Sequence, residues 1–152
     1  MRKTWTNIFM EENKRVFVDS NYFIALFNPA DSLHKQAISV GRKLHNERTQ
    51  LVISNLVFLE VVTVLSQKMS RNIAIQVGDY FIASPQVKLL HVDEVLQNEA
   101  WTVFTQTPLK NMSFVDCGII ACMKKEHIID LLTFDKKDFQ QLRKLFHFEL
   151  YY

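Results

Sequence analysis

Four acidic residues stand where a carboxylate could take part in chemistry. Asp19 ends the apolar run "RVFVD", and Asp135 ends the similar run "LLTFD". Glu60 lies in the middle of the apolar segment "SNLVFLEVVTVLSQ", and Asp116 lies near the start of the helical pattern "SFVDCGII". A buried carboxylate without a partner costs several kcal/mol, so each acid needs a cation, a hydrogen-bond donor or water.

The residue types indicate which cation such acids would bind. Carboxylates at one place repel one another, which raises their pKa unless a cation neutralises them. An oxygen-only ligand set suits Mg²⁺ or Mn²⁺ rather than zinc. No H-E-x-x-H or similar spacing joins the five histidines, which are His34, His45, His91, His127 and His147. If the acids converge, the sequence therefore predicts a site for a hard divalent cation.

Strand patterns alternate with helical patterns along the chain. Short apolar runs predict strands at "RVFVD", "TQLVIS", "QVKLLHV" and "HIIDLLTF", with "LFHFEL" as a possible edge strand. Helical spacing predicts helices over residues 20–27, 32–47, 54–67, 70–83, 94–106 and 113–126, with "DKKDFQQL" as a turn or short helix. This order predicts an α/β fold, a three-layer α/β/α sandwich with a central, mostly parallel sheet.

The predicted fold brings the four acids to one edge of the sheet. In parallel α/β sheets, ligands bind outside the carboxyl ends of the strands. Asp19 and Asp135 follow strands at that edge, and the helices that carry Glu60 and Asp116 can begin there. All four acids can therefore converge on one site.

Each acid also has an interpretation without catalysis. Glu60 fits the solvent edge of its helix, paired with Lys or Arg, and Asp19 fits an ordinary turn at a strand end. Ser113 and Asp116 fit a capping box, in which the acid bonds back to the helix start. The acids of "TFDKKDF" fit a solvated turn. In the helix over residues 94–106, Trp101 and Phe104 are expected in the core rather than as a platform for stacked bases.

The composition is that of one globular domain. The 152 residues are 48% hydrophobic and 22% charged, which is ordinary for a folded chain. We interpret residues 1–14 as an N-terminal extension and residues 15–152 as a single domain. The net charge of +2 excludes a protein that coats nucleic acid by bulk charge, but not a local basic surface.

Several large classes are excluded by what the sequence lacks. Glycines occur only at positions 41, 78 and 118, so a phosphate-binding loop and a dinucleotide fingerprint are both absent. Cys117 and Cys122 form no C-x-x-C motif and are interpreted as buried thiols in a reducing cytosol. Neither a secretory signal nor an apolar run of about 20 residues is present, so we expect a soluble cytoplasmic protein.

Four segments together resemble the PIN-domain nucleases. They are "VFVDSNYFIALF", the helix with Glu60, "MSFVDCGIIACMKK" and "LLTFDKKDF", within a likeness that runs from about Arg15 to Phe148. The chain is most similar to the VapC-type toxins of bacterial and archaeal toxin–antitoxin pairs. Each segment alone is weakly specific, whereas four in this order are fairly specific. The chain departs from the family at its N-terminus, because the strand motif usually begins almost at the first residue.

The resemblance implies a catalytic and metal-binding role for four acids: Asp19, Glu60, Asp116 and Asp135. It also implies supporting roles for Asn21 and Ser113. Asp138 is a further candidate, because "TFDKKDF" offers two choices for the fourth acid.

The activity implied by the resemblance is hydrolysis of RNA phosphodiester bonds with Mg²⁺ or Mn²⁺, leaving a 5′-phosphate and a 3′-hydroxyl. Asp19, Asp116 and Asp135 would hold the ion, and Glu60 would bind a second ion or orient the attacking water. RNA needs cations near these acids, and the C-terminal part offers Lys110, Lys124, Lys125, Lys136, Lys137, Arg143 and Lys144.

The resemblance also implies partners. A VapC-like protein is expected to form a homodimer whose active-site groove an antitoxin protein covers. The predicted helices over residues 54–83 are apolar enough for such an interface, although core packing explains the same residues.

Three alternatives remain open. A housekeeping PIN nuclease that matures ribosomal or transfer RNA would lack an adjacent small antitoxin gene. A non-catalytic PIN-like scaffold would lack one of the acids, and none is missing here. A phosphotransfer enzyme of the haloacid dehalogenase type would carry a second Asp where this chain has Asn21.

Overall fold

Five parallel strands form the central sheet of the chain, for which the computed structural model describes residues 13–151. Most of the expected N-terminal extension, residues 1–12, therefore lies outside the described residues. The strand order is β3-β2-β1-β4-β5, with every recorded pairing parallel. The strands are β1 (Arg15–Val18), β2 (Gln50–Ser54), β3 (Val87–Leu90), β4 (Asp130–Leu132) and β5 (Glu149–Leu150).

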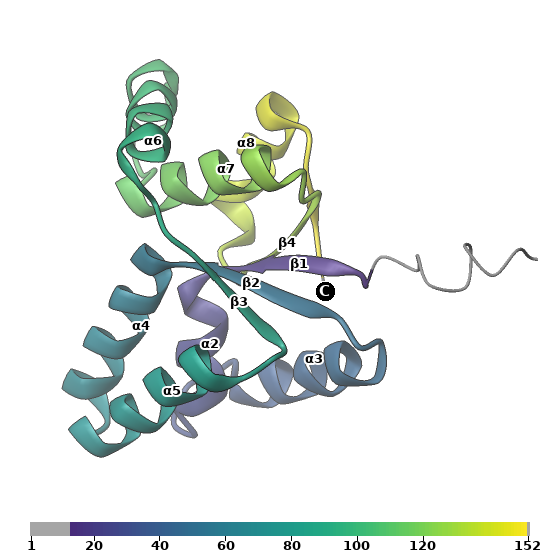
Figure 1. Ribbon diagram of the computed structural model, residues 1–152, viewed down its shortest axis with the longest axis vertical. Coiled ribbons are helices and arrows are strands. Elements are labelled where there is room, and N and C mark those ends of the chain that lie inside the picture. The colour runs from purple at the N-terminus through teal and green to yellow at the C-terminus, as the bar shows by residue number, and fades with distance from the viewer. Residues whose placement is uncertain (1–12, 152) are drawn as a thin grey trace, which may run out of the picture.

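Helices cover both faces of this sheet, so the predicted three-layer sandwich is confirmed (Figure 1). One layer contains α2 (Ser20–Phe27), α3 (His34–Asn46), α4 (Asn55–Lys68) and α5 (Arg71–Ala83). The other contains α6 (Glu94–Gln106), α7 (Phe114–Glu126) and α8 (Lys136–Phe146). Within residues 13–151, none of the helices combines the length and apolarity needed to span a membrane.

The core lies between the layers and is built on the central strands. Val16, Phe17 and Val18 of β1 are fully buried, because helices cover both faces of that strand. Cys117 and Cys122 are both buried and free, as expected from their apolar surroundings. Their burial raises the pKa of both thiols, so they pack as apolar groups.

Of two expectations about helices, one holds and one was wrong. The segment after Asp135, expected as a turn or short helix, forms an 11-residue helix, because Phe139 and Leu142 give it a buried face. Trp101 and Phe104 are not in the core, since their side chains are 57% and 42% exposed. The buried face of α6 consists instead of Leu96, Ala100 and Val103.

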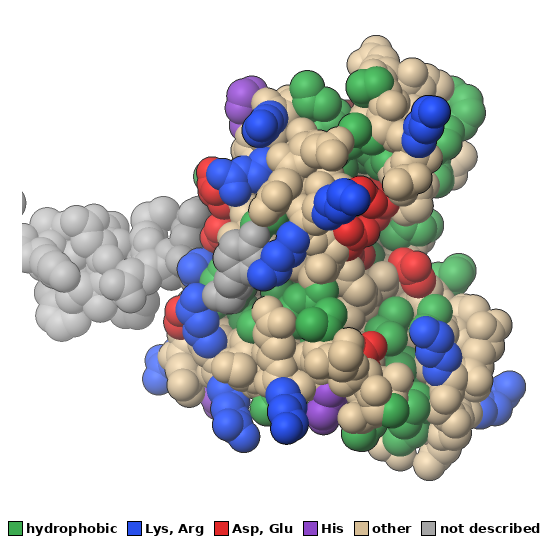
Figure 2. Space-filling view, turned by 180° about the vertical axis from the view of Figure 1, so that it is seen from behind, with side chains coloured by type: hydrophobic (Ala, Val, Ile, Leu, Met, Phe, Trp, Pro, Cys, Tyr) green, Lys and Arg blue, Asp and Glu red, His purple; other side chains and the backbone are tan. Residues whose placement is uncertain are grey.

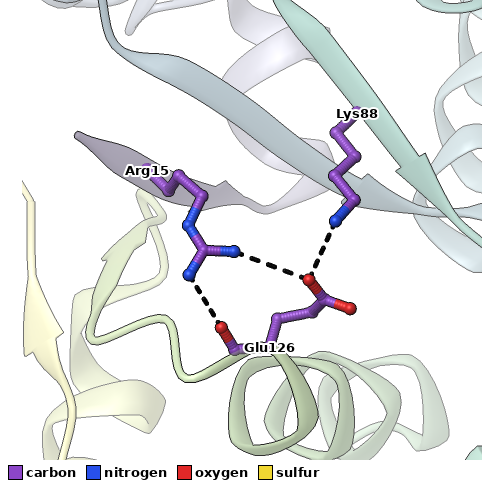
Figure 3. Close-up of polar contacts among 3 residues, drawn as sticks. All are labelled: Arg15, Lys88 and Glu126. Carbon is purple, nitrogen blue, oxygen red and sulfur yellow. Dashed lines mark hydrogen bonds and ion pairs between the residues drawn. The ribbon is translucent and has the colours of Figure 1, made fainter. Parts of the chain in front are cut away.

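The C-terminal end of α7 is fastened to the sheet by ionic contacts (Figure 3). Lys88 of β3 lies 2.9 Å from Oε2 of Glu126, and Arg15 of β1 lies 3.5 Å from the same oxygen. Arg15 also donates a hydrogen bond of 2.9 Å to the Glu126 carbonyl. The Glu126 side chain is only 19% exposed, so these contacts should contribute more to stability than a fully solvent-exposed ion pair does. They hold α7 along its axis, with Asp116 near the other end.

Candidate active site

The structure brings the four predicted acids to the carboxyl edge of the sheet. Asp19 follows β1, Asp135 follows β4 closely, and Glu60 and Asp116 lie near the starts of α4 and α7. Figure 2 shows acidic side chains gathered in a hollow between the two helical layers. The acids interact electrostatically. In addition to burial, the charges of Asp116 and Glu60 raise the pKa of Asp19, and those of Asp135 and Glu60 raise the pKa of Asp116.

Asp19 is the most buried member of the group, with 5% of its surface exposed. Its Oδ1 accepts a hydrogen bond of 2.7 Å from the Ser20 N–H, which also caps the start of α2. Burial raises the pKa of Asp19 from 3.8 to about 7, and the negative charges of Asp116 and Glu60 add to the rise. The hydrogen bonds from Thr133 and Ser20 act in the opposite direction.

Thr133 is a site residue that the sequence analysis did not single out. Its buried Oγ1 accepts hydrogen bonds from Asn21 Nδ2 at 3.1 Å and from the Asp135 N–H at 3.0 Å. With these acceptor positions filled, the hydroxyl donates to Asp19 Oδ2 at 2.8 Å. Asn21 is itself held by the Phe134 N–H. The one sequence signal for this role is a hydroxyl residue between a buried strand and a candidate acid.

Asp116 combines the two interpretations that the sequence allowed. It forms the capping box, in which its Oδ2 accepts from the Ser113 N–H at 2.9 Å and its own N–H donates to Ser113 Oγ at 3.1 Å. Burial raises the pKa of Asp116, and the charges of Asp135 and Glu60 raise it further. The hydrogen bonds with Ser113 lower it. The carboxylate therefore starts α7 and faces the other acids at the same time.

Glu60 lies at the border of the core rather than within it. The buried side of α4 is Val57, Val61 and Leu65, and the neighbouring Leu59 is 65% exposed. Glu60 is half-buried, and none of the ion pairs recorded among residues 13–151 includes it. The apolar segment is thus exposed on one side, and Glu60 acts electrostatically on Asp19 and Asp116.

The structure distinguishes the two candidates for the fourth acid. Asp135 is exposed at the start of α8, and its side chain makes no capping hydrogen bond there. Its charge contributes to the raised pKa of Asp116. Asp138 lies in the first turn of α8 and is not among the groups that raise that pKa. These observations favour Asp135.

The predicted cations fall into separate groups. Lys124 and Lys125 lie in the last turn of α7, at the end of the helix away from Asp116. Lys110 is exposed in the loop before α7. The remaining four, Lys136, Lys137, Arg143 and Lys144, belong to α8, which begins directly after Asp135.

The ligand chemistry of the site fits a hard divalent cation. Its acids offer only oxygen, and burial, with a smaller contribution from their mutual repulsion, raises the pKa of Asp19 and Asp116, an effect that a bound cation would relieve. As placed in the structure, no three or more His, Cys, Asp or Glu side chains of the described chain surround one point closely enough to hold a metal ion, so binding would require the acids to move closer together. The fit therefore rests on charge and donor type.

Comparison with known proteins places these features in a family. The sequence model of the PIN domain matches residues 16–145. The 23S rRNA-specific endonuclease VapC20 of Mycobacterium tuberculosis is 29% identical over 121 residues, which cover 79% of this chain and 88% of VapC20. Its crystal structure, described as a sarcin-ricin loop cleaving toxin, has a TM-score of 0.73 at 26% identity over 83% of this chain and 94% of that chain.

More distant structures share the fold. VapBC2 from Rickettsia felis, bound to a promoter DNA fragment, has a TM-score of 0.65 at 15% identity and covers 91% of this chain and 99% of its own. A toxin–antitoxin complex from Klebsiella pneumoniae has a TM-score of 0.57 at 18% identity, with 82% and 89% covered.

Proposed function

This chain belongs to the PIN-domain family, and on that premise we propose that it is a metal-dependent endoribonuclease, the toxin of a toxin–antitoxin pair. The observation that carries the proposal is the group of acids at the carboxyl edge, where burial first, and then the charges of Asp116 and Glu60, raise the pKa of Asp19 to about 7. Its relative VapC20 is an RNA endonuclease and is described as a toxin. We assign the activity to one domain, residues 15–152, acting on RNA in the cytoplasm.

In this proposal Asp19, Asp116 and Asp135 would hold Mg²⁺ or Mn²⁺. The cation, when bound, would supply positive charge to offset the negative charge that develops on the phosphodiester in the transition state. Glu60 lies on α4, in the helical layer opposite α7 and α8. Its half-buried carboxylate orients the attacking water and accepts its proton. Its lack of an ion pair among the described residues leaves this carboxylate available as a base or as a ligand for a second ion.

Thr133 and Asn21 act as positioning residues in the same proposal. The Thr133 hydroxyl donates to Asp19 Oδ2, so it stabilises the ionised form of Asp19, which binds a cation. Asn21 holds this hydroxyl by donating to Thr133 Oγ1. The direction of the network therefore favours the charge state that the activity requires.

We expect the purified protein to cut labelled RNA with Mg²⁺ or Mn²⁺, to stop with excess EDTA, and to resume when the cation is restored. The acids need a cation to approach the RNA phosphates, so removing it should abolish cleavage. The measurement is gel analysis of 5′-labelled and 3′-labelled RNA, which also identifies the new ends. Cleavage that persists in EDTA would contradict the metal-dependent mechanism.

A homodimer and an antitoxin complete the proposed assembly. Leu59 of α4 and the stacked pair Trp101 and Phe104 of α6 are large apolar side chains left 65%, 57% and 42% exposed. Exposed apolar groups of this kind indicate protein contacts. Leu59 is next to Glu60, and Trp101 and Phe104 pack against Phe114 at the start of α7, so contacts through α4 and α6 would place two sites close together.

Light scattering, combined with the cleavage assay, tests both partners. We expect the chain alone to have the mass of a dimer and Leu59→Glu combined with Trp101→Glu to shift it toward a monomer, because the new charges would have to be buried. The protein encoded beside the gene should add mass and inhibit cleavage. A wild-type monomer would contradict the dimer, and a neighbouring protein that neither binds nor inhibits would contradict the antitoxin.

A further inference from the structure

One face of α8 carries a polar stripe that begins beside the acids. The stripe consists of residues at helical positions i, i+3, i+4 and i+7: Lys137, Gln140, Gln141 and Lys144. All four are exposed, whereas Phe139 and Leu142 on the opposite side are buried in the core. A shallow groove of about 510 Å³ lies along this face and is also lined by Arg143. We call these four residues the basic stripe.

The two lysines of the basic stripe form none of the ion pairs recorded among the described residues. Among the ion pairs of residues 13–151, Arg143 joins Glu149 at 3.4 Å, but neither Lys137 nor Lys144 takes part in one. Figure 2 shows Lys and Arg side chains on the same face as the acidic hollow. The stripe therefore presents only hydrogen-bond donors of positive charge and amide groups to an approaching ligand.

Helix stability does not account for Lys137. The first turn of a helix has a positive partial charge, so a lysine there is unfavourable, whereas Lys144 in the last turn is favourable. Asp138 is the only acid in that first turn. Lys137 is exposed to solvent, lies beside the acids and occupies an unfavourable helix position, and this combination indicates a role in binding a negatively charged ligand.

The spacing of the stripe suits a nucleic-acid backbone. Seven residues of helix separate the two lysines, about 10 Å along the axis. A stacked strand advances about 3.4 Å for each phosphate, so this distance corresponds to about three nucleotides. α8 begins at Asp135, and Asp135 is coupled to Asp116, so a strand along the stripe leads into the acidic hollow.

We propose that the basic stripe binds the phosphate backbone of the RNA substrate on one side of the cut and directs that strand toward the acids. The inference rests on the proposed nuclease function and adds a binding surface to it. Lysines neutralise phosphates without reading bases, and glutamine amides donate to phosphate or ribose oxygens. The stripe therefore supplies affinity that does not depend on RNA sequence.

The test compares two double variants with the same loss of charge. Lys137→Gln with Lys144→Gln removes the stripe lysines, and Lys124→Gln with Lys125→Gln removes two exposed lysines at the far end of α7. Both are made in an Asp116→Asn background, which prevents cutting during the measurement. Binding of a fluorescein-labelled, 20-nucleotide RNA is measured by fluorescence anisotropy between 50 and 200 mM KCl.

The stripe variant should lose about 1.4 from the slope of log affinity against log salt, since each contact with a single-stranded phosphate contributes about 0.7. At 100 mM KCl this corresponds to a loss of affinity on the order of 25-fold. The α7 variant should keep the slope and affinity of its parent. Circular dichroism melts should show little net change in stability in the stripe variant, because the gain from removing Lys137 in the first turn offsets the loss of Lys144 in the last turn.

An equal loss in both variants would overturn the proposal, because net charge alone would then explain binding. So would an unchanged slope in the stripe variant. If that variant binds RNA normally but no longer binds the protein encoded beside the gene, the stripe is a protein contact and the proposal fails. Failure of the nuclease function itself would appear separately, as absence of metal-dependent cutting by the wild type.

Discussion

Replacing Asp116 with asparagine is expected to lower the rate of RNA cleavage by about a thousandfold or more while the chain stays folded. The change removes a negative charge that would hold the cation, and such charge stabilisation contributes several kcal/mol to the transition state. Asparagine keeps a side-chain oxygen that can accept the Ser113 N–H, so the capping box and the start of α7 should survive.

Asp138→Asn is the matched control for this variant. It makes the same chemical change in the first turn of α8, but Asp138 is not among the groups that raise the pKa of Asp116. We expect its cleavage rate to fall less than about tenfold, since it affects only the field near the site. Single-turnover cleavage of labelled RNA measures both rates. Equal losses in the two variants would show that the site does not discriminate between these acids and would contradict the assigned roles.

Asp19→Asn should abolish cleavage and yet make the cation-free protein more stable at pH 8. The folded-state pKa of Asp19 is about 7, above its ordinary value of 3.8. Between these values the folded chain binds more protons than the unfolded chain, so the free energy of unfolding falls as pH rises from about 4 to 7. The full difference corresponds to about 4 kcal/mol. Asparagine removes this cost, although its amide cannot accept all the hydrogen bonds that the carboxylate accepts from Ser20 and Thr133.

Urea unfolding in EDTA at pH 5 and pH 8 measures this effect. We expect the wild type to lose stability between the two values and the variant to change much less, with a net gain of about 1–3 kcal/mol at pH 8 after the weaker hydrogen bonding is subtracted. Added Mg²⁺ should stabilise the wild type at pH 8 and have a smaller effect on the variant. A wild type whose stability does not fall from pH 5 to pH 8 would contradict the raised pKa of Asp19.

The acids and the fold could be predicted from sequence because their signals are local. A buried strand that ends in an acid, such as "RVFVD", gives both the strand and the place of its carboxylate at the sheet edge. Helix starts were similarly readable, since Ser54 and Ser113 cap α4 and α7. The parallel sheet followed from the alternation of these elements.

Features that depend on packing between distant segments could not be read in this way. Thr133 is 114 residues from Asp19, and only the folded sheet places its hydroxyl against that carboxylate. Trp101 and Phe104 follow a helical spacing that does not reveal which side of α6 the core covers. The burial of Glu60 could not be read either. α4 is apolar on more than one side, and the sequence does not show which side the neighbouring elements bury.

The ionic contacts at the end of α7 far from Asp116 allow residues distant from the acids to affect the rate of cleavage. Thirteen residues of helix span about 20 Å, with Asp116 near one end and Glu126 at the other. A displacement of about 1 Å at a reacting group can cost up to a hundredfold in rate. Substitutions at Arg15, Lys88 or Glu126 can therefore lower the activity while every acid of the site remains intact.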